Sequence, residues 1–85
     1  MKKKIKSILI TGGTSGLGLS ISRLFLEKNY KVIITGTSEI SINKATKALE
    51  EQIKRNNNCY FIKYKATDRA AVNRLFKNYL KYSKK

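Results

Sequence analysis

The chain has 85 residues, 41% of them hydrophobic and 28% charged, and its 19 lysines and arginines against 5 acidic residues give a net charge of +14. This length allows one small domain, which buries only about 60% of its unfolded surface and therefore folds with little margin. A single cysteine and no histidine exclude a disulfide-stapled secreted mini-protein, a zinc site and a histidine-based catalytic dyad.

Three segments are predicted to form strands, and each is followed by a helical pattern. The strands are residues 7–11, 31–36 and 59–64, and the second of them is a continuous apolar run of the kind that is covered on both faces. Strands that alternate with helices indicate a parallel α/β sheet. Right-handed crossovers then give a Rossmann-type β-α-β-α-β-α half unit with strand order 3-2-1.

The three helices are predicted from apolar residues at helical spacing. The first begins near Leu17, and the candidate N-caps of the others are Ser38 or Ser41, and Thr67 or Asp68. The predicted inner faces are Leu17, Ile21, Leu24 and Phe25 in the first helix, Ile42, Ala45, Leu49 and Ile53 in the second, and Val72, Leu75, Phe76, Tyr79 and Leu80 in the third. The third helix is expected to cross to the opposite face of the sheet.

The positive charge has two explanations, and the composition favours the simpler one. The first explanation is that the chain binds RNA, DNA or an anionic membrane surface. A compositional explanation is that 15 Lys, 10 Ile and 7 Asn belong to residue types with A/T-rich codons. The lysines are scattered, whereas a nucleic-acid groove interleaves Arg and aromatic residues on one face. Binding of nucleic acid or of an anionic surface is therefore kept as the alternative function.

The start of the chain combines lysines with an apolar run, as a signal peptide does, but that run is only Ile8-Leu9-Ile10. A signal peptide needs roughly 7–15 apolar residues, and a membrane span needs roughly 20. The sequence therefore predicts no membrane segment and a cytoplasmic protein.

The segment with the clearest chemical meaning lies between the first strand and the first helix. Residues 11–18 read Thr-Gly-Gly-Thr-Ser-Gly-Leu-Gly, which has more glycines than a tight turn needs. The first N–H groups of a helix are unpaired and carry the positive end of the helix dipole, so a pyrophosphate is their natural ligand. Thr14 and Ser15 add hydroxyl donors, and Gly18 is predicted to let the helix pack closely on the strand.

Preceded by Thr11, the spacing Gly-x-x-x-Gly-x-Gly closely resembles the cofactor loop of the short-chain dehydrogenases/reductases, and within that superfamily it looks like that of a beta-ketoacyl-[acyl-carrier-protein] reductase. The resemblance covers nearly the whole chain. It includes residues 31–39, and residues 66–68 followed by Ala71-Val72, where the family commonly has Asp-Val-Thr-Asp before its third helix.

The resemblance implies a nicotinamide dinucleotide, NADP, as the cofactor. Carried over by position, the cofactor-binding residues are Gly12, Gly16 and Gly18 along the pyrophosphate, Thr14, Ser15 and Leu17 beside it, and Thr37 after the second strand. Members that prefer NAD usually place an acid where this chain has Gly36, so no carboxylate repels a 2′-phosphate there and Thr37 can donate to one. Glu39 is a rival acid, but its position also suits the first turn of the second helix.

The chain departs from the family pattern in two respects. Lys65 stands where the family often has Asp or Asn against adenine, and a lysine cannot accept the amino hydrogen bond of that base. The catalytic pair Tyr-x-x-x-Lys is missing, because none of the five tyrosines has a lysine four positions later, and the Asn-Ala-Gly stretch is missing too. Cys59 has no base at hand and is expected to be a small buried residue. No catalytic and no metal-binding residue is predicted.

Residues 1–85 are therefore predicted to be the NAD(P)-binding half domain of a longer short-chain oxidoreductase, which reduces a ketone or 3-oxoacyl group with NADPH when complete. The chain alone is expected to bind cofactor weakly and not to turn over, and an inactive gene remnant is a further alternative. With no fourth strand predicted beside residues 7–11, the exposed sheet edge and the third helix are expected to drive self-association.

Overall fold

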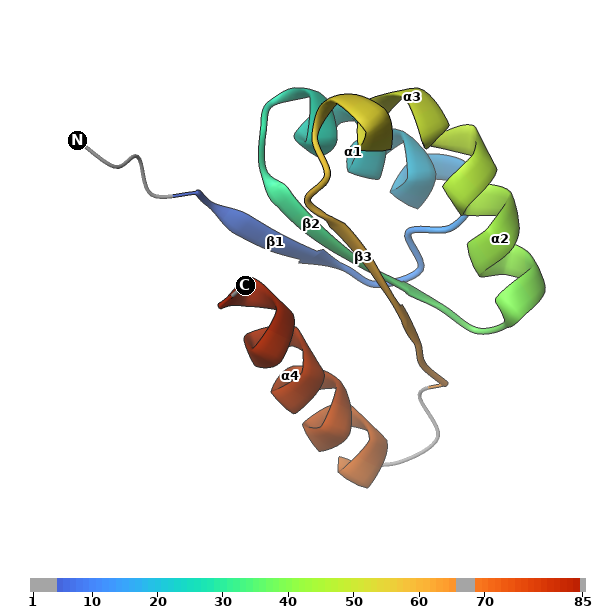
Figure 1. The fold of residues 1–85 in the computed structure, drawn as a ribbon. Coiled ribbons are helices and arrows are strands. Elements are labelled where there is room, and N and C mark those ends of the chain that lie inside the picture. Colours follow the sequence, from blue (N-terminus) through green and yellow to red (C-terminus); the bar gives the residue numbers. More distant parts are fainter. Residues whose placement is uncertain (1–4, 66–68, 85) are drawn as a thin grey trace.

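The computed structural model describes residues 5–65 and 69–84, and within them strands alternate with helices as predicted (Figure 1). The elements are β1 (Ser7–Ile10), α1 (Gly16–Glu27), β2 (Lys31–Gly36), α2 (Glu39–Ala48), α3 (Glu50–Arg55), β3 (Cys59–Lys63) and α4 (Arg69–Ser83). The candidate caps Thr67 and Asp68 lie outside the described residues.

The three strands form one parallel sheet in the order β1-β2-β3. In its register Ile10 lies beside Ile34, and Gly36 lies beside Lys63. Every residue of the central strand β2 is buried, as its continuous apolar run predicts. The predicted strand order and the Rossmann-type α/β half unit are therefore confirmed.

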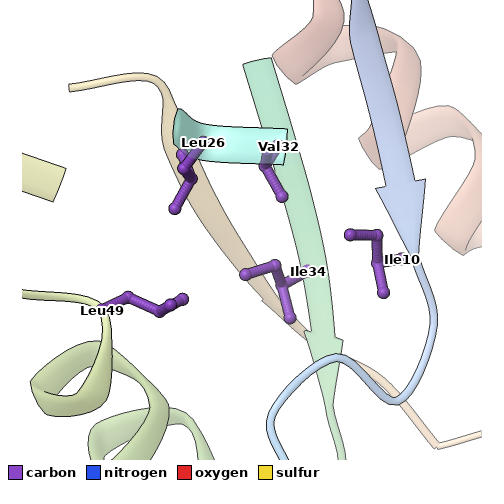
Figure 2. Close-up of a cluster of buried hydrophobic side chains, with 5 residues drawn as sticks. All are labelled: Ile10, Leu26, Val32, Ile34 and Leu49. Carbon is purple, nitrogen blue, oxygen red and sulfur yellow. The ribbon is translucent and has the colours of Figure 1, made fainter. Parts of the chain in front are cut away.

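The sheet has a helical layer on each face (Figure 1). Alternate residues of β2 point to opposite faces, so Val32 and Ile34 enter one core cluster and Ile33 enters another. The first cluster joins Ile10, Leu26, Val32, Ile34 and Leu49, whose side chains converge between β1, β2 and the helices α1 to α3 (Figure 2). The second joins Ile33, Ile62 and Leu75 under α4. The predicted crossing of the last helix to the opposite face is confirmed.

The second predicted helix is bent into two, α2 and α3, which meet at Leu49. Leu49 is fully buried in the first cluster, and its backbone links the two helices, because its N–H donates to Ala45 O and its carbonyl accepts from Ile53 N, each at 2.9 Å. The predicted inner face is retained through the bend. Ser38 is the N-cap, since its hydroxyl oxygen accepts a hydrogen bond from Ser41 N.

The predicted inner face of α1 is wrong in part. Leu17 is 77% exposed and Leu24 is 48% exposed, whereas Ser22 and Leu26 are buried. The small Ser22 side chain lies where the helix meets the glycine loop, and its hydroxyl donates to Gly18 O at 2.8 Å. The helix is therefore rotated so that a serine, which apolar periodicity ignores, takes an inner position.

The predicted inner face of α4 is also wrong in part. Ala71 and Leu75 are buried against the sheet, while Val72, Phe76 and Leu80 are exposed. The inward side is completed by tyrosines: Tyr79 shares a hydrogen bond of 3.0 Å with Ser7 Oγ on β1, and Tyr82 stacks on a ring of β3. An apolar stripe on the flank of α4 is thereby left facing outward.

Candidate functional site

The glycine loop between β1 and α1 holds two residues in the left-handed region. Gly12 has φ +66° and Gly16 has φ +54°, a conformation that L side chains rarely adopt. The N–H of Gly12 donates to Thr35 Oγ1 at 3.0 Å, so the loop is tied to the end of β2. These two glycines set the path by which the chain leaves the strand and enters the helix.

Two other glycines serve close packing. A Cβ on Gly18 would collide with Gly12 O and lie 2.9 Å from Gly13 Cα, and one on Gly13 would lie 2.7 Å from Ile34 Cγ2 and 2.9 Å from Ile10 Cγ2. The close contact of Gly18 is therefore with residues 12–13 of the loop that follows β1. Gly13, absent from the predicted site, joins the loop to the core.

The N-terminus of α1 is the electropositive end of this loop. Ser15 is the N-cap with extended backbone, φ −154° and ψ 165°, and its side chain makes no capping hydrogen bond. Because a helix leaves its first N–H groups without intrahelical partners, and Ser15 does not cap them, these donors suit an anion.

A hollow of about 460 Å³ lies at the carboxyl ends of the strands. Its lining residues are Thr11, Gly12, Thr14, Ser15, Thr35, Gly36, Thr37 and Tyr64. Four predicted site residues therefore come together there, namely Gly12, Thr14, Ser15 and Thr37. The other three, Gly16, Leu17 and Gly18, lie in the adjoining first turn of α1 and are not among the lining residues.

Sequence reasoning missed Thr35 and Tyr64 in this hollow. Both lie where a strand ends, and the hydrogen bond of 2.9 Å from Tyr64 N to Gly36 O continues the sheet past β3. Their positions at the ends of predicted strands could have identified them, because the carboxyl ends of parallel strands meet at one edge and ligands of open α/β sheets bind there.

The hollow is uncharged, because none of the described residues that line it carries a formal charge. A Cβ on Gly36 would lie 2.8 Å from both Ile42 Cγ1 and Thr14 Cγ2, so an acid at this position would require rearrangement. Glu39 is not a lining residue and lies in the first turn of α2, where a negative charge favours the helix.

Three further features concern the cysteine, metal binding and membrane segments. Burial raises the pKa of the Cys59 thiol to about 12, so the thiol stays protonated near neutrality. The residue is partly buried, where the sequence predicts a buried one. Among residues 5–65 and 69–84 there is no group of three or more acidic, histidine or cysteine side chains placed to hold a metal ion. In the same part of the chain no helix is long and apolar enough to cross a membrane.

A parallel sheet with a glycine turn at its carboxyl edge defines an α/β protein of the Rossmann type. The sequence model of the short chain dehydrogenase family matches residues 6–85. The chain therefore belongs to the short-chain dehydrogenase family, which confirms the resemblance seen in the glycine loop.

Known proteins of the same family resemble this chain in sequence and in structure. An NADP-dependent (R)-specific alcohol dehydrogenase of Lentilactobacillus kefiri is 37% identical over 73 residues, which cover 86% of this chain and 27% of the relative. The glucose dehydrogenase of Caenorhabditis elegans superposes with a TM-score of 0.80 at 21% identity, over 99% of this chain and 36% of that one. A chain provisionally assigned as a betaketoacyl-ACP reductase superposes with a TM-score of 0.71 at 26% identity. The match covers 89% of this chain and 30% of that one. This chain spans about a quarter of the length of the alcohol dehydrogenase.

Proposed function

We propose that this chain, residues 1–85, is the NADP-binding portion of a short-chain oxidoreductase and binds the cofactor across the hollow at the carboxyl edge of its sheet. The observation that carries the proposal is the glycine loop. Its backbone is fixed by two left-handed glycines and by the contact of Gly18 with residues 12–13, and it ends at a helix N-terminus with no side-chain cap.

The donors of this site fit a dinucleotide. The pyrophosphate would lie at the N-terminus of α1, with the glycines allowing it to approach the backbone. Its proposed contacts are Gly12, Gly16 and Gly18 along the backbone and Thr14, Ser15 and Leu17 beside them. Thr37 would donate to the ribose end. A bound nicotinamide supplies hydride for ketone reduction, and the residues of this chain hold and orient the cofactor.

Three observations support NADP rather than NAD. The described lining of the hollow carries no carboxylate that would repel a 2′-phosphate. Gly36 is packed so tightly that an acid does not fit without movement of Thr14 or Ile42. The alcohol dehydrogenase of L. kefiri is NADP-dependent by name.

The chain carries no Tyr-x-x-x-Lys pair, so we propose that it binds cofactor without turning substrate over. Reduction of a ketone or 3-oxoacyl group is proposed for a longer protein that supplies the pair. The cytoplasm is the proposed location.

Calorimetric titration of the chain with NADPH and NADH tests this function. NADPH is expected to bind more tightly, and Thr37→Asp is expected to weaken NADPH selectively, because a carboxylate would repel the 2′-phosphate. Asn43→Asp is the matched control, since it adds the same charge at an exposed position of α2 outside the hollow. Equal affinity for both cofactors contradicts the assignment of Thr37. Tight binding of RNA that falls steeply with salt, without cofactor binding, supports the nucleic-acid alternative instead.

We also propose that the chain self-associates through β1 and the neighbouring flank of α4. Within the described residues β1 pairs with β2 alone, so one side of β1 is an open edge of the kind that templates pairing. The exposed stripe Val72, Phe76 and Leu80 adds apolar surface on α4. The proposed occupant is a second copy of this chain.

A further inference from the structure

The acidic residues of the chain are distributed unevenly over the two faces of the sheet. Four of them, Glu27, Glu39, Glu50 and Glu51, lie on α1, α2 or α3, and the fifth, Asp68, lies outside the described residues. Residues 69–84, which include the whole of α4, contain no acidic residue. Because α4 lies on the opposite face from the other helices (Figure 1), the described part of that face presents cations without any carboxylate.

The outward side of α4 joins an apolar stripe to a row of cations. Val72, Phe76 and Leu80 recur every fourth residue and are 51%, 57% and 40% exposed, so they share one flank of the helix. The positions that follow them by one residue form the neighbouring row around the helix. That row includes Lys77 and Lys81, and both are exposed. The outward side of α4 is therefore amphipathic, and its polar part is basic.

The same combination continues from the end of α4 to the start of β1. Lys31 joins the two segments, because its N–H donates to Lys6 O at 2.8 Å and its Nζ donates to Ser83 O at 3.2 Å. Near this junction Ile5 is 58% exposed, and Lys6 and Lys84 are exposed as well. Apolar and cationic side chains thus occur together along α4 and at its end.

The charge and the accessibility of this helix favour a flat anionic surface as its partner. A protein groove that binds an amphipathic helix encloses it, but Ala71 and Leu75 of α4 are buried against the sheet, so only the outward side is free. Nucleic acid uses cations and aromatic rings, whereas Val72 and Leu80 in the stripe are aliphatic. A bilayer of anionic lipids offers phosphates for the lysines and an apolar boundary for the stripe.

We propose that the outward side of α4 docks the chain onto an anionic lipid bilayer, with the helix lying along the surface and not crossing it. Val72, Phe76 and Leu80 would lie at the boundary between headgroups and acyl chains. Lys77 and Lys81 would lie among the lipid phosphates, while their methylene stems cover apolar surface. The inference goes beyond the proposed function, because no residue of α4 lines the cofactor hollow.

The bilayer and a second copy of the chain compete for the stripe, and ionic strength separates the two. A second copy carries the same cations and is repelled when salt is low, whereas an anionic bilayer is then attracted most strongly. Docking is therefore expected to weaken as salt is added, in the opposite direction to self-association.

Flotation with lipid vesicles tests the docking, because aggregates of the chain sink while bound chains rise. The vesicles contain equal amounts of phosphatidylcholine and phosphatidylglycerol, or phosphatidylcholine alone, at about 0.1 M salt, where the Debye length is about 10 Å. The charge variant is Lys77→Gln, Lys81→Gln. Its matched control is Lys44→Gln, Lys47→Gln, which removes the same charge at exposed positions of α2 on the other face.

The apolar part of the patch is tested by Phe76→Ser, and its control is Ile40→Ser, which removes an exposed apolar side chain from α2. Thermal unfolding of each variant checks that it is folded, and Lys81→Gln alone serves if the double variant is not.

The parent is expected to float with the anionic vesicles and not with the neutral ones. Each cation near an anionic surface contributes about a fivefold factor, so the charge variant should lose on the order of 20-fold in affinity. Phe76→Ser should lose about tenfold, and both controls should bind as the parent does. Equal binding to neutral vesicles overturns the docking, and so does an equal loss in the α2 charge control, which indicates general electrostatics. A Phe76→Ser variant that binds like the parent overturns it too, because the stripe would then play no part.

Discussion

The two faces of the sheet are built differently, and the difference separates the proposed binding site from the proposed surface of self-association. The face under α1, α2 and α3 is closed by aliphatic side chains around Val32 and Ile34, which are fully buried. The face under α4 is covered by one helix, through Leu75 and a set of tyrosines. The first face carries the glycine loop at its edge, while the second leaves an apolar stripe outward.

Tyrosine rings and a hydrogen bond complete the α4 face, where fewer aliphatic side chains are buried. The Tyr60 and Tyr82 rings stack with centroids 4.9 Å apart, and the buried Lys31 donates from Nζ to Ser83 O at 3.2 Å. This hydrogen bond contributes less than the burial of an aliphatic side chain, since a net hydrogen bond is worth about 1 kcal/mol and a buried leucine or isoleucine about 1.5–3 kcal/mol. We therefore expect the closed face to carry most of the stability of the fold.

The largest effect is expected from truncation of the closed core. Leu26→Ala is predicted to cost about 2–5 kcal/mol of unfolding free energy, because Leu26 is 1% exposed and its truncation leaves a cavity in the core. Leu75→Ala on the other face should cost about 2 kcal/mol of unfolding free energy, the low end of that range. Urea unfolding of both variants measures the difference. Equal costs would mean that the two faces contribute alike.

Gly18→Val tests the junction between the closed face and the glycine loop. The branched side chain would meet the backbone of residues 12–13 and is predicted to cost about 1–3 kcal/mol, as overpacking does. Leu17→Val is the control, because Leu17 is exposed and its substitution should change stability by less than about 0.5 kcal/mol. A Gly18→Val variant as stable as the parent would contradict the close contact.

Sedimentation at rising salt tests the outward stripe of α4. The net charge of +14 opposes association at low salt, and screening weakens that repulsion, so association is predicted to increase with salt. Phe76→Ser should reduce it, whereas Leu17→Ser, which removes an apolar side chain of α1 that is still more exposed (77% against 57%), should not. A parent that remains monomeric at high salt contradicts self-association.

The smallest effect is expected at the polar contact between α4 and β1. Tyr79→Phe removes the hydroxyl that shares a 3.0 Å hydrogen bond with Ser7, at a predicted cost of about 0.5–1.5 kcal/mol. Thermal or urea unfolding measures it. Ser7→Ala should reproduce the loss, and the double variant should lose little more than either single one, because both remove the same bond.

Local sequence was enough to predict the order of the elements, the parallel sheet and the glycine loop. The continuous apolar run of β2 is itself the signature of a strand buried on both faces, and alternation of strands with helices restricts the connections to right-handed crossovers. The loop was recognisable because left-handed and close-packed positions demand glycine, as at Gly12 and Gly18. These features depend on local backbone geometry, and each such geometry favours particular residue types that can be recognised in the sequence.

The tertiary structure alone decided which side of each helix faces inward and which residues share a hollow. Apolar periodicity shows that one side of a helix is apolar, but it does not fix how the helix is rotated about its axis. In α4 it could not distinguish Val72 and Phe76, which are exposed, from Ala71 and Leu75, which the sheet buries. Thr35 and Tyr64 are distant in sequence and come from the ends of different strands. They meet because the parallel register aligns the ends of β2 and β3, and a register is fixed only when the layers pack.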